Sequence, residues 1–71
     1  MKLPQISGRE LIKNLCRHGF VIIRQRGSHI RLEKNTPEGT IKITVPDNKV
    51  LKKGTLHHIL KTAGMQIEDL S

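Results

Sequence analysis

Apolar residues in the first part of the chain recur at helical spacing. Ser7-Gly8-Arg9-Glu10 has the spacing of a capping box, in which Ser7 accepts from the N–H three residues on and Glu10 reaches back to the Ser7 N–H. Four apolar positions then fall on one helical face: Leu11, Ile12, Leu15 and Cys16. His18 suits the negative end of the helix dipole, and Gly19 suits a left-handed residue after the helix. The pattern predicts a helix over residues 8–18.

The period then changes to two, which is the period of strands. Residues 20–26 are β-branched and apolar before they become basic, and Gly27-Ser28 separates them from residues 29–34, which alternate. After a turn predicted over residues 35–39, residues 40–45 alternate again. Three strands should therefore form an antiparallel meander. Alternation places one set of side chains against the helices: Ile30, Leu32, Ile41, Ile43 and Val45. A second set lies on the opposite face: His29, Arg31, Lys42 and Thr44.

A second helical pattern follows a polar connection. Thr55 is expected to cap this helix, and Gly64 stands just past its end. Its apolar face consists of Leu56, Ile59, Leu60 and Ala63. A short terminal turn against the core should contain Met65, Ile67 and Leu70. The predicted fold class is α+β in the order α-β-β-β-α, with both helices on one face of the sheet.

The 71 residues leave room for one domain, which we place at 1–71. Cys16 is the only cysteine, so no internal disulfide or cysteine-built zinc site is available, and a reducing cytoplasm fits. The chain starts without an apolar signal region, and no stretch approaches the roughly 20 apolar residues of a membrane span. We expect a cytoplasmic protein that does not engage a membrane.

The net charge of +7 and the pI near 10.2 predict a polyanionic partner. Most of the cations fall in residues 17–34 and 42–61, within the predicted domain and not in a basic tail. The alternative is that the basic residues form an ordinary solvated surface that binds no polyanion. Phe20 is the only aromatic residue, which argues against recognition of single-stranded bases by stacking.

His29 is the strongest candidate for chemistry. Alternation puts it out of phase with Ile30, beside the Gly27-Ser28 turn and among basic residues. RNA cleavage without a metal needs a group that takes a proton from the 2′-OH or gives one to the leaving 5′-oxygen, and histidine titrates near neutrality. It also needs positive charge near the phosphate. Spacing alone nevertheless favours an ordinary surface strand residue.

Other polar residues suggest weaker sites. Neighbouring helical positions point about 100° apart, so His57 and His58 cannot jointly hold one metal, and we assign no metal site. Residues 52–55 precede the second helix, where Lys52, Lys53 and free backbone N–H groups could bind a phosphate, although a plain solvated cap fits equally well. No nucleotide-binding motif or paired-carboxylate set is present, and we expect no cofactor.

Together these residues resemble the HicA family of toxins, small ribonucleases that pair with HicB antitoxins. The resemblance covers nearly the whole chain and rests on fragments in family order: Ser7-Gly8, Gly19-Phe20, Arg24-Gln25-Arg26-Gly27-Ser28-His29, Val45-Pro46 and Lys53-Gly54-Thr55-Leu56. It implies a fold like that of double-stranded RNA-binding domains. It also implies that His29 is the catalytic histidine of a Gly-Ser-His motif, which reverses the interpretation from spacing alone.

The resemblance further implies a toxin that cleaves messenger RNA without a cofactor, is monomeric when free, and is inhibited by a HicB-like antitoxin over its active face. We assign RNA binding to Arg24, Arg26, Ser28, Arg31, Lys52 and Lys53. Many family members carry a histidine shortly after Val-Pro, where this chain has Asp47-Asn48-Lys49. Lysines could replace it electrostatically, or Asp47 could orient His29. Two other hypotheses remain: a non-catalytic RNA-binding module, and a subunit whose basic face docks an acidic protein.

Overall fold

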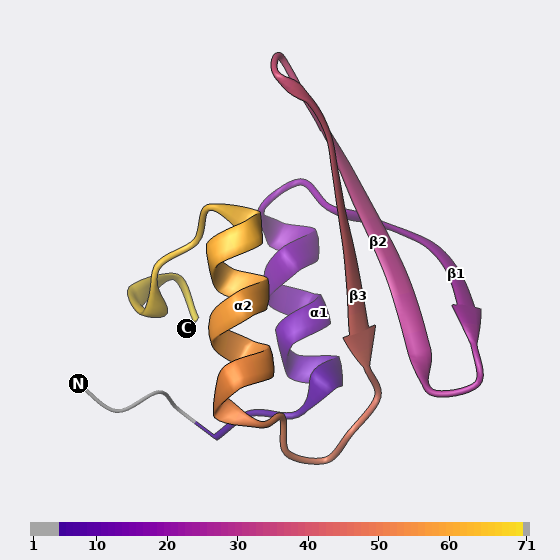
Figure 1. Ribbon diagram of the computed structural model, residues 1–71, viewed down its shortest axis with the longest axis vertical. Helices are drawn as coiled ribbons and strands as arrows, with labels where there is room; N and C mark the ends of the chain where they lie inside the picture. The colour runs from indigo at the N-terminus through magenta and orange to yellow at the C-terminus, as the bar shows by residue number, and fades with distance from the viewer. Residues whose placement is uncertain (1–4, 71) are drawn as a thin grey trace.

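The computed structural model describes residues 5–70 and confirms the predicted order of elements (Figure 1). Those elements are α1 (Gly8–Arg17), β1 (Val21–Arg26), β2 (His29–Thr36), β3 (Gly39–Pro46), α2 (Lys53–Ala63) and the 3₁₀ turn η1 (Ile67–Asp69). The sheet is antiparallel with the order β1-β2-β3, and both helices lie on one side of it. Within residues 5–70, no helix has the length and apolar character needed to cross a membrane.

The first helix begins as predicted. The Ser7 hydroxyl accepts from the Glu10 N–H at 3.1 Å, and the Glu10 carboxylate accepts from the Ser7 N–H at 3.4 Å. The helix ends one residue earlier than expected, with His18 as its cap, and Gly19 has a φ of 94°. Leu11, Ile12 and Leu15 are buried as the pattern predicted. Cys16 is exposed, so its assignment to the apolar face was wrong.

The hydrophobic core lies between the helices and the inner face of β2 and β3. Ile30 is opposite Val45, and Leu32 is opposite Ile43, and all four are buried. Ile41 is partly buried against the same core. Directly opposite residues in an antiparallel pair share a face, so these four residues lie together on the helix side. The residues between them along each strand point away from the helices. The two predicted faces of β2 and β3 are therefore confirmed.

The turn between β2 and β3 is shorter than predicted, because residues 35, 36 and 39 belong to the strands. Asn35 is opposite Thr40, whose hydroxyl donates to the Asn35 side chain at 2.9 Å. The Thr36 hydroxyl donates to the Gly39 carbonyl at 2.7 Å. These side-chain bonds extend the ladder up to the two turn residues. The segment is rich in turn-forming residues, so the sequence did not indicate this extension.

The second helix starts earlier than expected. Lys52 is its N-cap without a capping side chain, and Thr55 is already the third helical residue, so the predicted Thr55 cap was wrong. The backbone is helical from Lys53 onward because the Leu56 N–H already donates to the Lys52 carbonyl at 2.9 Å. Gly64 ends the helix in the left-handed conformation, as predicted. Leu56, Ile59 and Leu60 complete the core with Met65, while Ala63, Ile67 and Leu70 pack against its margin.

Candidate active site

Five side chains from all three strands line one open cleft of about 160 Å³ on the sheet face opposite the helices. They are Arg24, Arg26, His29, Arg31 and Thr44. Arg24 is directly opposite Arg31, and Arg26 is directly opposite His29. Arg31 is in turn opposite Thr44. The imidazole predicted to be catalytic therefore shares a cleft of the sheet face with three guanidinium groups.

An irregularity in β1 sorts its side chains between the two faces. Ile22 is opposite Leu32, which faces the helices, whereas Arg24 is opposite Arg31, which faces away from them. Residues two apart share a face in a regular strand, so Ile22 and Arg24 could not diverge in this way without a register shift. Ile23 is the additional residue of that bulge. Without the bulge, a strand that keeps Ile22 on the helix side would also turn Arg24 and Arg26 to that side, away from the cleft.

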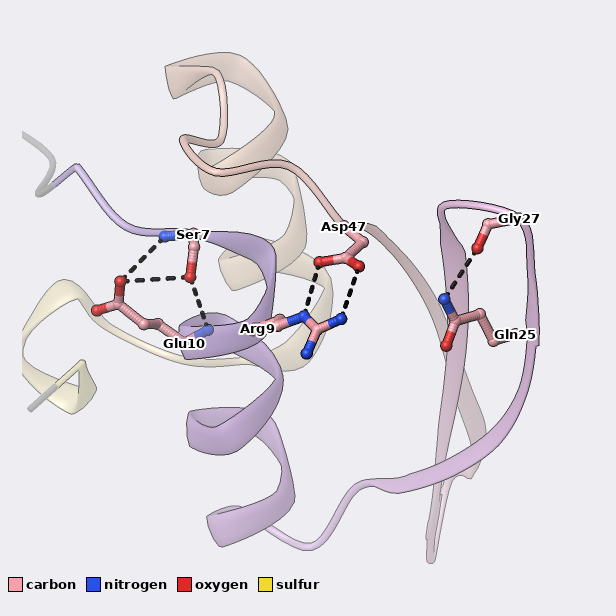
Figure 2. A network of polar contacts seen from close by, with 6 residues as sticks. All are labelled: Ser7, Arg9, Glu10, Gln25, Gly27 and Asp47. Carbon is pink, nitrogen blue, oxygen red and sulfur yellow. Dashed lines mark hydrogen bonds and ion pairs between the residues drawn. The ribbon is translucent and has the colours of Figure 1, made fainter.

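The turn before His29 is held on both sides. Gly27 has a φ of 57°, a conformation that glycine adopts without a side-chain clash, and its carbonyl accepts from the Gln25 amide at 2.9 Å (Figure 2). On the other side, the Asp47 N–H donates to the Ser28 carbonyl at 2.6 Å. The turn that precedes His29 is thus tied to its own strand by a side-chain contact and to the end of β3 by a main-chain contact.

The N-terminus of α1 clamps that end of β3. The Arg9 guanidinium forks onto the Asp47 carboxylate at 3.2 and 3.3 Å (Figure 2). Hydrogen bonding to Asp47, together with its negative charge, raises the pKa of Arg9 above its ordinary value. The Gly8 N–H donates to the Asn48 carbonyl at 2.9 Å. The Asp47 carboxylate therefore pairs with Arg9, and its main chain, not its side chain, supports the turn that carries His29.

The charge of the cleft is only partly compensated. The Arg31 guanidinium lies 3.8 Å from the Glu33 carboxylate, a long and partly exposed ion pair. Such surface pairs contribute little to stability and are screened by salt. Arg24 and Arg26 form no salt bridge within residues 5–70. The cleft therefore presents a surplus of cationic hydrogen-bond donors, which suits the oxygens of a phosphate diester.

The predicted RNA-binding residues do not all meet at this cleft. Arg24, Arg26 and Arg31 line it with His29, whereas Ser28 lies in the adjacent turn and Lys52 and Lys53 lie at the start of α2. That helix start and the β1–β2 turn lie at the same end of the molecule (Figure 1). No acidic residue occupies the first turn of α2.

Thr44 is the cleft residue that the sequence did not assign. Alternation placed it on the correct face together with His29 and Arg31, and the structure adds that it lies directly opposite Arg31. Among residues 5–70, no group of three or more histidine, cysteine or acidic side chains could hold a metal ion. The residues that line the cleft supply an imidazole, which can transfer protons, and guanidinium groups, which can stabilise negative charge.

The chain is a small, basic α-β-β-β-α domain with three arginines and a histidine in one cleft of the sheet face away from the helices. Residues 8–65 match the family model described as HicA toxin of bacterial toxin-antitoxin. The match spans most of the chain, and the protein belongs to the HicA family, as the toxin member of a toxin–antitoxin pair. Comparison with curated proteins gave no match.

Proposed function

We propose that this toxin is an endoribonuclease that cleaves messenger RNA, with His29 as its general acid or base and without a metal ion. The observation that carries the proposal is the shared cleft, in which His29 lies with Arg24, Arg26 and Arg31. The family to which the chain belongs supports the same activity, since the resemblance of Gly27-Ser28-His29 to its catalytic motif implies RNA cleavage.

In this mechanism the cleft binds a phosphate diester with its scissile link beside His29. The neutral imidazole takes the proton of the 2′-OH, the 2′-oxygen forms a bond to phosphorus, and the bond from phosphorus to the 5′-oxygen breaks. The leaving 5′-oxygen receives a proton from solvent or from the imidazolium. The guanidinium groups stabilise the negative charge that grows on the phosphate oxygens. Where the imidazolium is the donor, a single imidazole serves both proton transfers.

On one side of the scissile link, the RNA strand would extend from the cleft toward the α2 start. Ser28, Lys52 and Lys53 lie at that end of the molecule and would contact the backbone phosphates. Lys53 and its successors present backbone N–H groups at the positive end of the helix dipole. We further propose that the protein acts in the cytoplasm, is monomeric when free, and is inhibited when a HicB-like antitoxin covers the cleft.

Replacement of the imidazole tests the enzymatic part of the proposal. His29→Ala should lower the rate of RNA cleavage by about 10²–10⁴-fold, the usual contribution of general acid–base catalysis. His57→Ala is the matched control, because His57 is an exposed histidine on α2 outside the cleft. Purified proteins and a defined RNA give the rate directly, and growth after induced expression gives the effect in cells. Equal rates for the two variants would refute catalysis by His29.

A non-catalytic RNA-binding module is the second candidate, and one observation favours it. The chain has Asp47-Asn48-Lys49 where many family members carry a histidine, and Asp47 is engaged by Arg9. This candidate predicts RNA binding with no cleavage, by the wild type and His29→Ala alike. Binding and cleavage measured on the same RNA therefore separate the two functions.

A further inference from the structure

A second cleft of about 250 Å³ lies between β3 and α2, around the free edge of the sheet. Three of its lining residues come from β3, namely Lys42, Ile43 and Thr44. Three come from α2, namely His58, Ile59 and Thr62. We call this the β3–α2 groove. None of its residues except Thr44 takes part in the active-site cleft.

The groove combines the contacts that a nucleotide unit requires. Ile43 and Ile59 are buried and form an apolar floor, against which a ribose or base can pack. Lys42 and His58 are exposed at its walls and offer N–H donors, which in the case of lysine carry a positive charge. Thr44 and Thr62 supply hydroxyl groups that both donate and accept, as binding of a 2′-OH demands.

The groove is continuous with the active-site cleft through Thr44, which lines both. On β2, Arg31 is opposite Thr44, and His29 is two residues away from Arg31. Two residues of a strand span roughly 6.6 Å. A strand of RNA bound at His29 can therefore pass over Thr44 and enter the groove with the next nucleotide.

The N–H donors of the groove are available for this role. Glu33 is directly opposite Lys42, but its ion pair is with Arg31. Within residues 5–70, neither Lys42 nor His58 takes part in an ion pair. A second hollow next to α2 is lined by His57, Lys61 and residues 64–67, among others, and shares no residue with the active-site cleft. Of these two hollows, the groove on the β3 side is the one that shares a residue with the active-site cleft.

From this juxtaposition we infer that the β3–α2 groove is a binding subsite for one ribose–phosphate unit of the RNA strand, next to the unit that is cleaved. Lys42 and His58 contact the phosphate, and Thr62 contacts the 2′-OH. The inference rests on the proposed ribonuclease function, because that function brings RNA to the neighbouring cleft.

The test uses RNA binding in a His29→Ala background, in which the RNA is not cleaved. Single-stranded RNAs of increasing length are titrated against this parent and against two further variants. Lys42→Ala/His58→Ala removes the groove contacts, and His57→Ala/Lys61→Ala is the matched control, with the same residue types removed from the other side of α2. All four positions are exposed, so the fold should persist.

We expect the shortest RNA to bind all three proteins alike and the longer RNAs to bind the groove variant about tenfold more weakly, since that is the usual effect of losing a charge-assisted hydrogen bond. Equal affinities of the groove and control variants for long RNA would overturn the inference while leaving the proposed function intact. Failure of the parent to bind RNA, together with absence of cleavage by the wild type, would overturn both.

Thr62→Val separates ribose from phosphate recognition. In the same background it should weaken binding of long RNA and leave binding of the corresponding DNA unchanged, because only RNA has a 2′-OH. An equal loss for RNA and DNA would refute the ribose contact. Amide chemical shifts of Lys42 and His58 should also move when long RNA is added, and their failure to move would refute the subsite.

Discussion

Gly8 holds the N-terminus of α1 close to the segment that supports the active site. Its N–H donates to the Asn48 carbonyl, and the space where a Cβ would lie is occupied by the carbonyl oxygen of Pro46. The next residue, Arg9, binds Asp47, whose N–H supports the turn before His29. The contact of α1 with the segment after β3, which supports the turn before His29, therefore depends on the absence of a side chain at Gly8.

Gly8→Ala should destabilise the protein by about 1–3 kcal/mol, the usual cost of forcing an additional carbon into a packed site. Chemical denaturation measures this change in the free energy of unfolding. Gly54→Ala is the control, because nothing lies within 4 Å of a Cβ there and the residue is helical. The control should be neutral or slightly stabilising, since alanine favours helices. Equal stability of both variants would contradict the proposed close packing at Gly8.

At the scale of elements, the helices cover the sheet unequally. Leu32 of β2 is fully buried, whereas its direct partner Ile22 of β1 is 51% exposed. Both side chains point to the helix side, so the alternation of the strands does not explain their different exposure. The helices cover β2 but not the part of β1 that contains Ile22. Phe20, just before β1, is buried and attaches the strand to the core. β1 therefore contributes to the site more than to the core.

Leu32→Ala should cost about 2–5 kcal/mol of unfolding free energy, the range for truncation of a buried leucine. Ile22→Ala should cost less than about 1 kcal/mol, because half of the side chain is already in contact with water. Thermal or urea denaturation of the two variants compares the positions directly. Similar losses would show that β1 belongs to the core after all.

The sequence predicted the elements that depend on neighbouring residues. The capping box at Ser7 and the two faces of β2 and β3 follow from local spacing, and each is present in the structure. The same alternation predicted that His29 lies on the sheet face that points away from the helices. In these elements the spacing of nearby residues alone decides which side chains are buried or act as caps.

Features that depend on distant residues were not predictable. The run Val21-Ile22-Ile23 has no alternation that could indicate a bulge, because the exposed edge strand accepts apolar side chains on either face. The pairing of Arg9 with Asp47 joins residues 38 positions apart. At the start of α2, a suitable capping side chain at Thr55 predicted the wrong cap, because the chain becomes helical at Lys53 without one.

At the scale of the whole molecule, the two faces of the sheet have different tasks. The protein is a slab with extents of 31 × 28 × 18 Å, and the helices occupy one side of it. The chain has a net charge of +7. The arginines of the cleft contribute to it on the uncovered face, which they share with His29. An RNA strand bound on that face should release the counterions of each phosphate that an arginine neutralises.

The salt dependence of RNA affinity therefore tests which cations the RNA contacts. Each neutralised phosphate of a single strand contributes about 0.7 to the slope of log K against log salt concentration. In the His29→Ala background, Arg24→Ala/Arg26→Ala should flatten that slope by about 1.4 if each arginine neutralises one phosphate. Lys13→Ala/Lys61→Ala removes the same charge from exposed positions on the helices and should leave the slope unchanged. Equal flattening by both pairs would mean that RNA responds to the net charge of the protein, whereas flattening by the arginine pair alone would place the phosphates on the sheet face beside residue 29.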